Sequence, residues 1–228
     1  MSTERAALAR RLSGVYLLTP DVAPVGFASM LLKLRAALAT GIAAVQYRNK
    51  LASLADRHRE ARAVLASARE YGALFIVNDD VELALELRAD GVHLGRDDGD
   101  IATARARLPH TLLGVSCYNE LQRARHAAAA GADILAFGSV FASATKPAAV
   151  RAPLTLLQQA RVELPGQRIV AIGGINDGNI AAVSAAGAHA AAVIGAVFDA
   201  PDATGAARRL QQEFNQGLSQ HGSQRATV

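Results

Sequence analysis

Residues 73–95 read ALFIVNDDVELALELRADGVHLG, two short apolar runs separated by a segment with helical spacing. The runs Ala73–Asp79 and Gly91–Gly95 are almost continuously apolar, which is typical of parallel strands covered on both faces. Val81–Leu87, between them, has the pattern of a helix. The stretch is therefore predicted to be a strand, a helix and a second strand parallel to the first.

The same alternation runs along the whole chain. Six more strands are predicted, at Gly14–Thr19, Ile42–Arg48, Leu112–Cys117, Ala132–Val140, Arg168–Ile175 and Ala190–Val197. Eight strands alternating with helices predict an α/β protein with a single (β/α)₈ TIM barrel. The alternative is an open doubly wound sheet, but the first strand is not followed by the G-x-G-x-x-G turn that such sheets use for dinucleotides.

Local signals place the ends of several helices. Ser53 and Asp80 are predicted to cap the starts of two helices, because their side chains can accept hydrogen bonds from free backbone N–H groups. Glycines are predicted where helices stop, at Gly41, Gly72, Gly91, Gly131 and Gly187. An extra helix is expected over residues 1–12. The barrel domain is expected to span residues 1–215, followed by a polar, disordered tail over residues 216–228.

Composition narrows the function classes. Hydrophobic residues make up 51% and charged residues 19% of the chain, which allows a large core. The net charge is +4, but the basic residues are scattered rather than clustered, which argues against a nucleic-acid partner. No apolar run is long enough for a membrane span. The single cysteine, Cys117, excludes an intrachain disulfide, so we expect a cytoplasmic protein; a homo-oligomer is left open.

Polar residues gather after the predicted second strand. Gln46 and Arg48 alternate along its end, so they should point the same way, and Lys50 lies just beyond them. Active sites of TIM barrels lie at the carboxyl ends of the strands. Two cations and an amide there suit a polyanion such as diphosphate, although an ordinary solvated turn is the alternative.

Carboxylates follow the third and fourth strands. Asp79 and Asp98 would face the cations and are predicted to hold a Mg²⁺ ion, which prefers one or two carboxylates together with substrate oxygens and water. Helix capping is the alternative for both residues. His93, inside the fourth strand, is interpreted as a packed core histidine.

The fifth and sixth strands supply further polar residues. No His or Asp stands where it would make Ser116 or Cys117 a nucleophile, so Ser116 is interpreted as a hydrogen-bond donor and Cys117 as packing. Ser143, Thr145 and Lys146 follow the sixth strand and can hold the edge of a phosphate. The segment 142–150 around them is the candidate lid.

Glycines end the last two strands. Gly174 and Gly195 lie where TIM barrels commonly bind phosphate through backbone N–H groups, although tight barrel packing would also explain them. The sequence thus predicts one site for a metal-bound diphosphate and another for a monophosphate. Two such small phosphorylated substrates suggest that the second molecule displaces diphosphate from the first.

Six motifs carry a family resemblance. They are V-Q-Y-R-N-K, I-V-N-D-D, G-V-H-L-G-R-D-D, G-V-S-C-Y-N, G-S-V-F-A-S-A-T-K-P and V-A-I-G-G-I. In this order and at this spacing, over residues 14–198, they resemble the thiamine-phosphate synthase family. That family consists of TIM-barrel transferases that join hydroxymethylpyrimidine diphosphate to a thiazole phosphate, or its carboxylated form, and release diphosphate.

The resemblance implies a role for each matching residue. The pyrimidine diphosphate would be bound by Gln46, Tyr47, Arg48, Asn49, Lys50, Asn78, Ser116 and Lys146. The thiazole phosphate would be bound by Ser143, Ala144, Thr145, Gly174, Ile194 and Gly195. Asp79 and Asp98 would bind one Mg²⁺ per subunit. Arg48, Lys50, Ser116 and Lys146 would be catalytic, with diphosphate leaving first and the thiazole nitrogen capturing the pyrimidine-methyl cation.

The chain departs from the family pattern at four positions. Asn49 stands where an acidic residue is usual, Arg96 where Gln is frequent, Ser143 where Thr is common and Gly195 where Ser is common. Two alternative functions are a related thiazole tautomerase and a non-catalytic sensor of thiamine phosphates. The tautomerase uses a histidine shortly after strand five, and residues 116–119 contain none; a sensor would not need the intact set of metal and diphosphate ligands.

Overall fold

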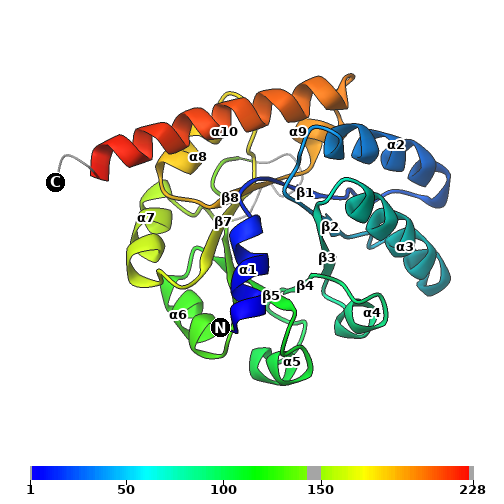
Figure 1. The fold of residues 1–228 in the computed structure, drawn as a ribbon, viewed down its shortest axis with the longest axis horizontal. Coiled ribbons are helices and arrows are strands. Elements are labelled where there is room, and N and C mark those ends of the chain that lie inside the picture. Colours follow the sequence, from blue (N-terminus) through cyan, green and yellow to red (C-terminus); the bar gives the residue numbers. More distant parts are fainter. Residues whose placement is uncertain (1, 143–149, 226–228) are drawn as a thin grey trace.

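The strands close into a barrel in the computed structural model, which describes residues 2–142 and 150–225. All neighbouring strands are parallel and follow chain order, so the predicted TIM barrel is confirmed (Figure 1). The strands are β1 (Gly14–Leu18), β2 (Ala44–Tyr47), β3 (Leu74–Asn78), β4 (Gly91–Leu94), β5 (Leu112–Tyr118), β6 (Ile134–Phe137), β7 (Arg168–Ile172) and β8 (Ala190–Val193).

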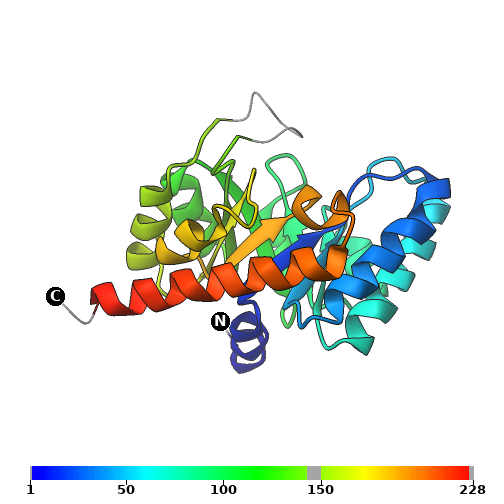
Figure 2. The ribbon, with the colours of Figure 1, turned by 90° about the horizontal axis from the view of Figure 1, so that it is seen from above.

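Helices surround the barrel (Figures 1 and 2). They are α1 (Thr3–Arg11), α2 (Phe27–Leu38) after the short 3₁₀ turn η1 (Pro24–Gly26), α3 (Leu54–Glu70), α4 (Val81–Glu86), α5 (Ile101–Arg107), α6 (Leu121–Ala129), α7 (Leu154–Glu163), α8 (Ile180–Ala185), α9 (Gly195–Phe198) and α10 (Ala203–Arg225). The extra N-terminal helix is confirmed as α1, and Ala9 and Leu12 at its end pack with residues of the barrel interior. None of the helices in the described residues is long and apolar enough to span a membrane.

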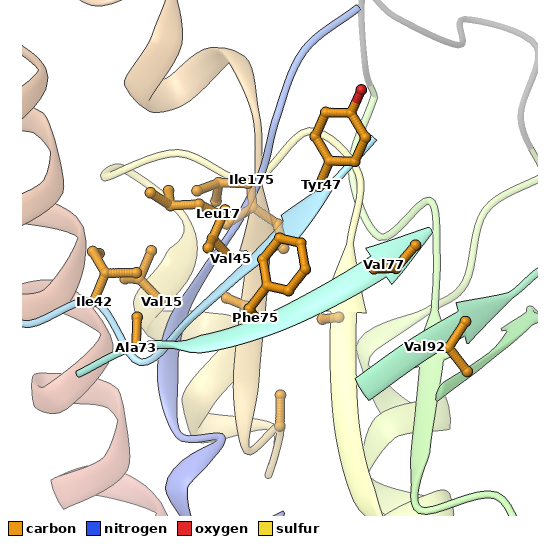
Figure 3. Packing of buried hydrophobic residues seen from close by; sticks show 14 of the residues in the cluster. Val15, Leu17, Ile42, Val45, Tyr47, Ala73, Phe75, Val77, Val92 and Ile175 are labelled. Atoms are coloured by element: carbon orange, nitrogen blue, oxygen red, sulfur yellow. The ribbon is translucent and has the colours of Figure 1, made fainter. Parts of the chain in front are cut away.

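The strands alternate between two hydrophobic clusters. Val45 and Phe75 belong to the larger cluster, between the strands and the helices, and Figure 3 shows them with Tyr47 and Val77 among its members. Ala44 and Ile76 belong to the smaller cluster inside the barrel. Because successive side chains of a strand point to opposite faces, the even-numbered positions of β2 face the interior.

Helix starts and stops follow the predicted chemistry with one exception. Ser53 Oγ accepts from Asp56 N (3.1 Å) and Asp80 Oδ1 from Leu83 N (2.9 Å), so both caps are confirmed. Helices end near four glycines with positive φ, which are Gly41, Gly72, Gly131 and Gly187. The prediction for Gly91 is wrong, because this residue begins β4, and Arg88 takes the positive φ after α4.

Two predicted boundaries near the C-terminus need correction. The strand predicted over Ala190–Val197 ends at Val193, because the chain turns into α9, where Asp199 N donates to Gly195 O (3.0 Å). The expected disorder from residue 216 is also corrected, since α10 continues to Arg225. A Cβ on Gly217 would lie 2.1 Å from Ala181 O, so this part of α10 packs closely on α8.

Candidate active site

A cavity of about 620 Å³ opens at the carboxyl ends of β2, β3 and β4. Arg48 and Lys50 reach it from the β2–α3 loop, Asn78 and Asp79 from the end of β3, and Asp98 from the β4–α5 loop. The structure therefore brings these five of the residues predicted for the diphosphate and the metal to one cavity.

The carboxyl groups of Asp79 and Asp98 lie close enough for Asp98 to affect the protonation of Asp79. Burial and the neighbouring Asp98 carboxylate raise the pKa of Asp79 to about 6, and Lys50 partly opposes this rise. Lys50 Nζ lies 3.9 Å from Asp79 Oδ2. Two carboxylates held so close concentrate negative charge, which a cation would relieve.

Helix capping does not explain this pair. Asp80 caps α4 and Asp100 caps α5, with Asp100 Oδ1 accepting from Thr103 N (2.8 Å). Asp98 Oδ2 instead accepts from Gly95 N (2.6 Å), which holds the carboxylate in the β4–α5 loop. The alternative of capping alone is therefore wrong for Asp79 and Asp98.

The donors present fit a Mg²⁺ ion. In the part of the chain that the structure describes, no three His, Cys, Asp or Glu side chains gather as a metal site. Mg²⁺ does not need such a cage, because it is commonly held by one or two carboxylates with substrate oxygens and water completing the octahedron. Asp79 and Asp98 supply that carboxylate pair beside the cations that would hold a phosphate.

The β2–α3 loop is tied to the loop after β1. Asp21 Oδ2 pairs with an Arg48 guanidinium nitrogen (2.7 Å), and Asp21 Oδ1 accepts from Lys50 N (2.7 Å). Thr19 Oγ1 accepts from Arg48 N (2.8 Å) and donates to Arg48 O (2.7 Å). Asp21 was not predicted from the sequence, although a carboxylate just beyond the first strand is a signal that points to it.

Tyr47 and Asn49 are tied to helix α3 beneath the β2–α3 loop. Both are almost wholly buried, at 2% and 6% exposed, and both donate hydrogen bonds to Glu60 Oε2 on α3, each at 2.9 Å. The polar ends of these side chains therefore point toward the helix layer. Both residues nevertheless contribute to the lining of the cavity, and their role as contacts to the pyrimidine diphosphate stays a prediction.

The remaining residues singled out on β2, β4 and β5 are Gln46, His93, Ser116 and Cys117. Gln46 Nε2 donates to the Tyr16 hydroxyl (2.7 Å). His93 is a packed core histidine as predicted, 9% exposed, and burial lowers its pKa to about 4. Its Nε2 lies 2.9 Å from Ser116 Oγ, the hydroxyl predicted to contact substrate. Cys117 is fully buried, and burial raises the pKa of its thiol to about 12, which fits a packing role.

Glycines shape the opposite side of the barrel top. Gly174 has φ +66°, and a Cβ there would lie 2.2 Å from Ala142 O. Tight packing alone thus suffices to require this glycine. Ile194 and Gly195 form the turn from β8 into α9. The predicted contacts Ser143, Ala144, Thr145 and Lys146, and most of the candidate lid, lie outside the described residues.

Arg96, in the β4–α5 loop, contacts two side chains at the end of β5. Its guanidinium lies over the Tyr118 ring, 4.9 Å from the centroid, and also pairs with Glu120. Arg96 is thereby held by residues at the end of β5.

A closed parallel barrel with cations and paired carboxylates at its carboxyl end defines a class, the TIM-barrel enzymes that act on phosphorylated small molecules. Comparison with known proteins makes the assignment specific. Residues 15–197 match the family model described as thiamine monophosphate synthase. The chain belongs to this family.

Individual relatives agree. The chain is 49% identical to the thiamine-phosphate synthase of Bordetella bronchiseptica, covering 89% of this chain and 95% of the relative. It is 51% identical to that of Chromobacterium violaceum, covering 90% and 97%. Among solved structures, it resembles thiamine phosphate pyrophosphorylase from Pyrococcus furiosus with a TM-score of 0.81 and 34% identity, covering 92% of this chain and 98% of that one.

Proposed function

We propose that this chain is a thiamine-phosphate synthase, a transferase that joins hydroxymethylpyrimidine diphosphate to a thiazole phosphate and releases diphosphate. The observation that carries the proposal is the cluster of Lys50, Asp79 and Asp98 beside Arg48, at one end of a barrel of this family. Such a cluster suits a diphosphate that binds together with a divalent cation.

The cations act on the leaving group. The bond between the pyrimidine methylene carbon and the diphosphate oxygen breaks, and its electron pair stays on that oxygen. Arg48 and Lys50 stabilise the charge that develops there. Asp79 and Asp98 would hold Mg²⁺, which when bound neutralises diphosphate charge.

The second half of the reaction requires positioning more than protein chemistry. The thiazole nitrogen supplies the electron pair for the new carbon–nitrogen bond, so no protein nucleophile takes part. Ser116 contacts the pyrimidine diphosphate together with Lys146. Gly174, Ile194 and Gly195, with Ser143, Ala144 and Thr145, hold the thiazole phosphate and orient the nitrogen toward the cation.

Genetic complementation tests the function. A bacterial strain that lacks its own thiamine-phosphate synthase should grow without thiamine when it expresses this chain. Asp98→Asn should fail to rescue growth, whereas Asp97→Asn, at the exposed neighbouring position, should rescue it. Absence of growth with well-expressed wild-type protein would contradict the proposal, because a tautomerase or a sensor cannot supply thiamine phosphate.

A further inference from the structure

Helix α3 buries a carboxylate, Glu60, beneath the loop that carries the two cations. Glu60 is 0% exposed, and its Oε2 accepts hydrogen bonds from Tyr47 and Asn49. Its Oε1 has no hydrogen-bond partner among the residues that the structure describes. A buried polar atom without a partner costs free energy, so the requirements of folding alone do not account for Glu60.

Asn49, which bonds to Glu60, uses both ends of its side chain to join separate segments. Its Nδ2 donates to Glu60 Oε2 (2.9 Å) and to Val22 O (2.9 Å). Its Oδ1 accepts from Val22 N (3.3 Å) and Leu51 N (3.1 Å). Asn49 thus links the loop after β1, the loop after β2 and helix α3 at one point.

The position of Asn49 in the sequence makes this link useful. It lies between Arg48 and Lys50, and the odd positions of this segment point to α3. With Tyr47 and Asn49 fixed to Glu60, Arg48 reaches Asp21 (2.7 Å) and Lys50 approaches Asp79 (3.9 Å). If the anchor were lost, the loop could turn and move both cations away from the cavity.

We propose that Glu60 is a positioning residue for diphosphate binding, which acts through Asn49 to hold Arg48 and Lys50 toward the cavity. The proposal rests on the function proposed above, in which these two cations bind the diphosphate. Glu60 itself touches no substrate.

Asn49 stands where the resembling family usually has an acidic residue, and in this chain its amide nitrogen donates to Glu60 and to Val22 O. An aspartate here would set a second carboxylate against the buried Glu60 carboxylate. It would also lack the two N–H donors that now serve Glu60 and Val22 O. In this chain Asn49 and Glu60 are therefore a matched pair, and Asn49→Asp should be harmful.

Calorimetric titration with two ligands tests the proposal. The full-length protein is titrated with inorganic diphosphate in the presence of Mg²⁺, and separately with the thiazole phosphate. Glu60→Ala and Asn49→Asp should each weaken diphosphate binding by about tenfold, with the affinity for thiazole phosphate unchanged. Glu60→Gln keeps an acceptor oxygen and should stay within about threefold of wild type.

Glu70→Ala is the matched control, because Glu70 lies on the same helix but pairs with Arg35 at the surface. It should bind both ligands as wild type does. Equal weakening of both ligands in Glu60→Ala and Asn49→Asp would show a merely structural role, and unchanged diphosphate binding would show no role; either overturns the proposal. A loss in Glu60→Gln as large as in Glu60→Ala would also contradict it.

Three further outcomes are also decisive, and the last two separate this inference from the proposed function. If Glu60→Ala does not fold, Asn49→Asp breaks the same contact from the other side and decides the matter. If wild-type protein binds no diphosphate, the proposed function fails first. If wild-type protein makes thiamine phosphate and Asn49→Asp binds diphosphate normally, only the positioning role fails.

Discussion

Asp79 and Asp98 show how individual residues set the chemistry of the cavity. Both are held by backbone contacts with the end of β4, since Asp79 N donates to His93 O (2.8 Å) and Gly95 N donates to Asp98 Oδ2 (2.6 Å). Burial, together with this proximity, raises the pKa of Asp79. The fold thus holds together two like charges that would otherwise separate, which makes sense when a divalent cation joins them.

Removing one of these carboxylates should impair catalysis and leave the fold intact. Asp98→Asn is expected to lower kcat/KM by about 100-fold, because the amide is a poorer ligand and lacks the charge that attracts the metal. Steady-state kinetics over a range of Mg²⁺ concentrations measures this. Asp97→Asn, at the exposed neighbouring position, should behave as wild type. Equal kinetics in the two variants would remove Asp98 from the metal site.

His93 links a single residue to the pH dependence of stability. Burial lowers its pKa to about 4 in the folded state, against 6.5 when free. Between these values the unfolded chain binds the proton and the folded chain does not, so the free energy of unfolding decreases as the pH is lowered. Above about pH 6.5, His93 is neutral in both states and does not lower the free energy of unfolding. As the pH falls toward 4, its protonation in the unfolded chain lowers the free energy of unfolding by about 3 kcal/mol.

Denaturant titration of wild type and His93→Gln between about pH 7 and pH 4 checks this, since the shared groups cancel in the difference. The stability of wild type should fall more steeply than that of the variant. Parallel curves would mean that His93 has the same pKa in the folded and the unfolded chain.

Among the elements, α10 differs most from expectation. Polar composition predicted disorder from residue 216, yet the helix continues because its inner face packs on α8. Ser184 Oγ donates to Phe214 O (2.7 Å), and Gly217 leaves no space beside Ala181 and Ser184. The polar composition of this segment reflects the residues on the exposed face of the helix. It does not indicate that a small residue, Gly217, packs against α8.

Gly217→Ala tests this contact. The added methyl group would lie 2.1 Å from both Ala181 O and Ser184 Oγ, so the helices must separate. We expect a loss of about 1–3 kcal/mol in the free energy of unfolding. Chemical denaturation measures it, with Gln216→Ala on the exposed side as control. If Gly217→Ala is as stable as that control, α10 does not pack on α8 as described.

For the whole molecule, the alternation of apolar strands and helices was enough to predict the barrel, because each strand must be covered on both faces. Alternation also placed Arg48 and Lys50 toward the site. The sequence could not show that Glu60 accepts from Tyr47 and Asn49, because residues distant in the chain become partners only when α3 packs on β2. Side-chain contacts between different helices and strands could therefore not be predicted from the sequence.

The whole account depends on one coupled reaction, so the most direct measurement follows both products together. Purified protein, Mg²⁺, hydroxymethylpyrimidine diphosphate and the thiazole phosphate are mixed, and thiamine phosphate and diphosphate are quantified over time. We expect thiamine phosphate and diphosphate to form in equal amounts. Without the thiazole phosphate, no more diphosphate than that of a single turnover should appear. EDTA should abolish the activity. Folded protein that binds the substrates and forms no thiamine phosphate would contradict this account.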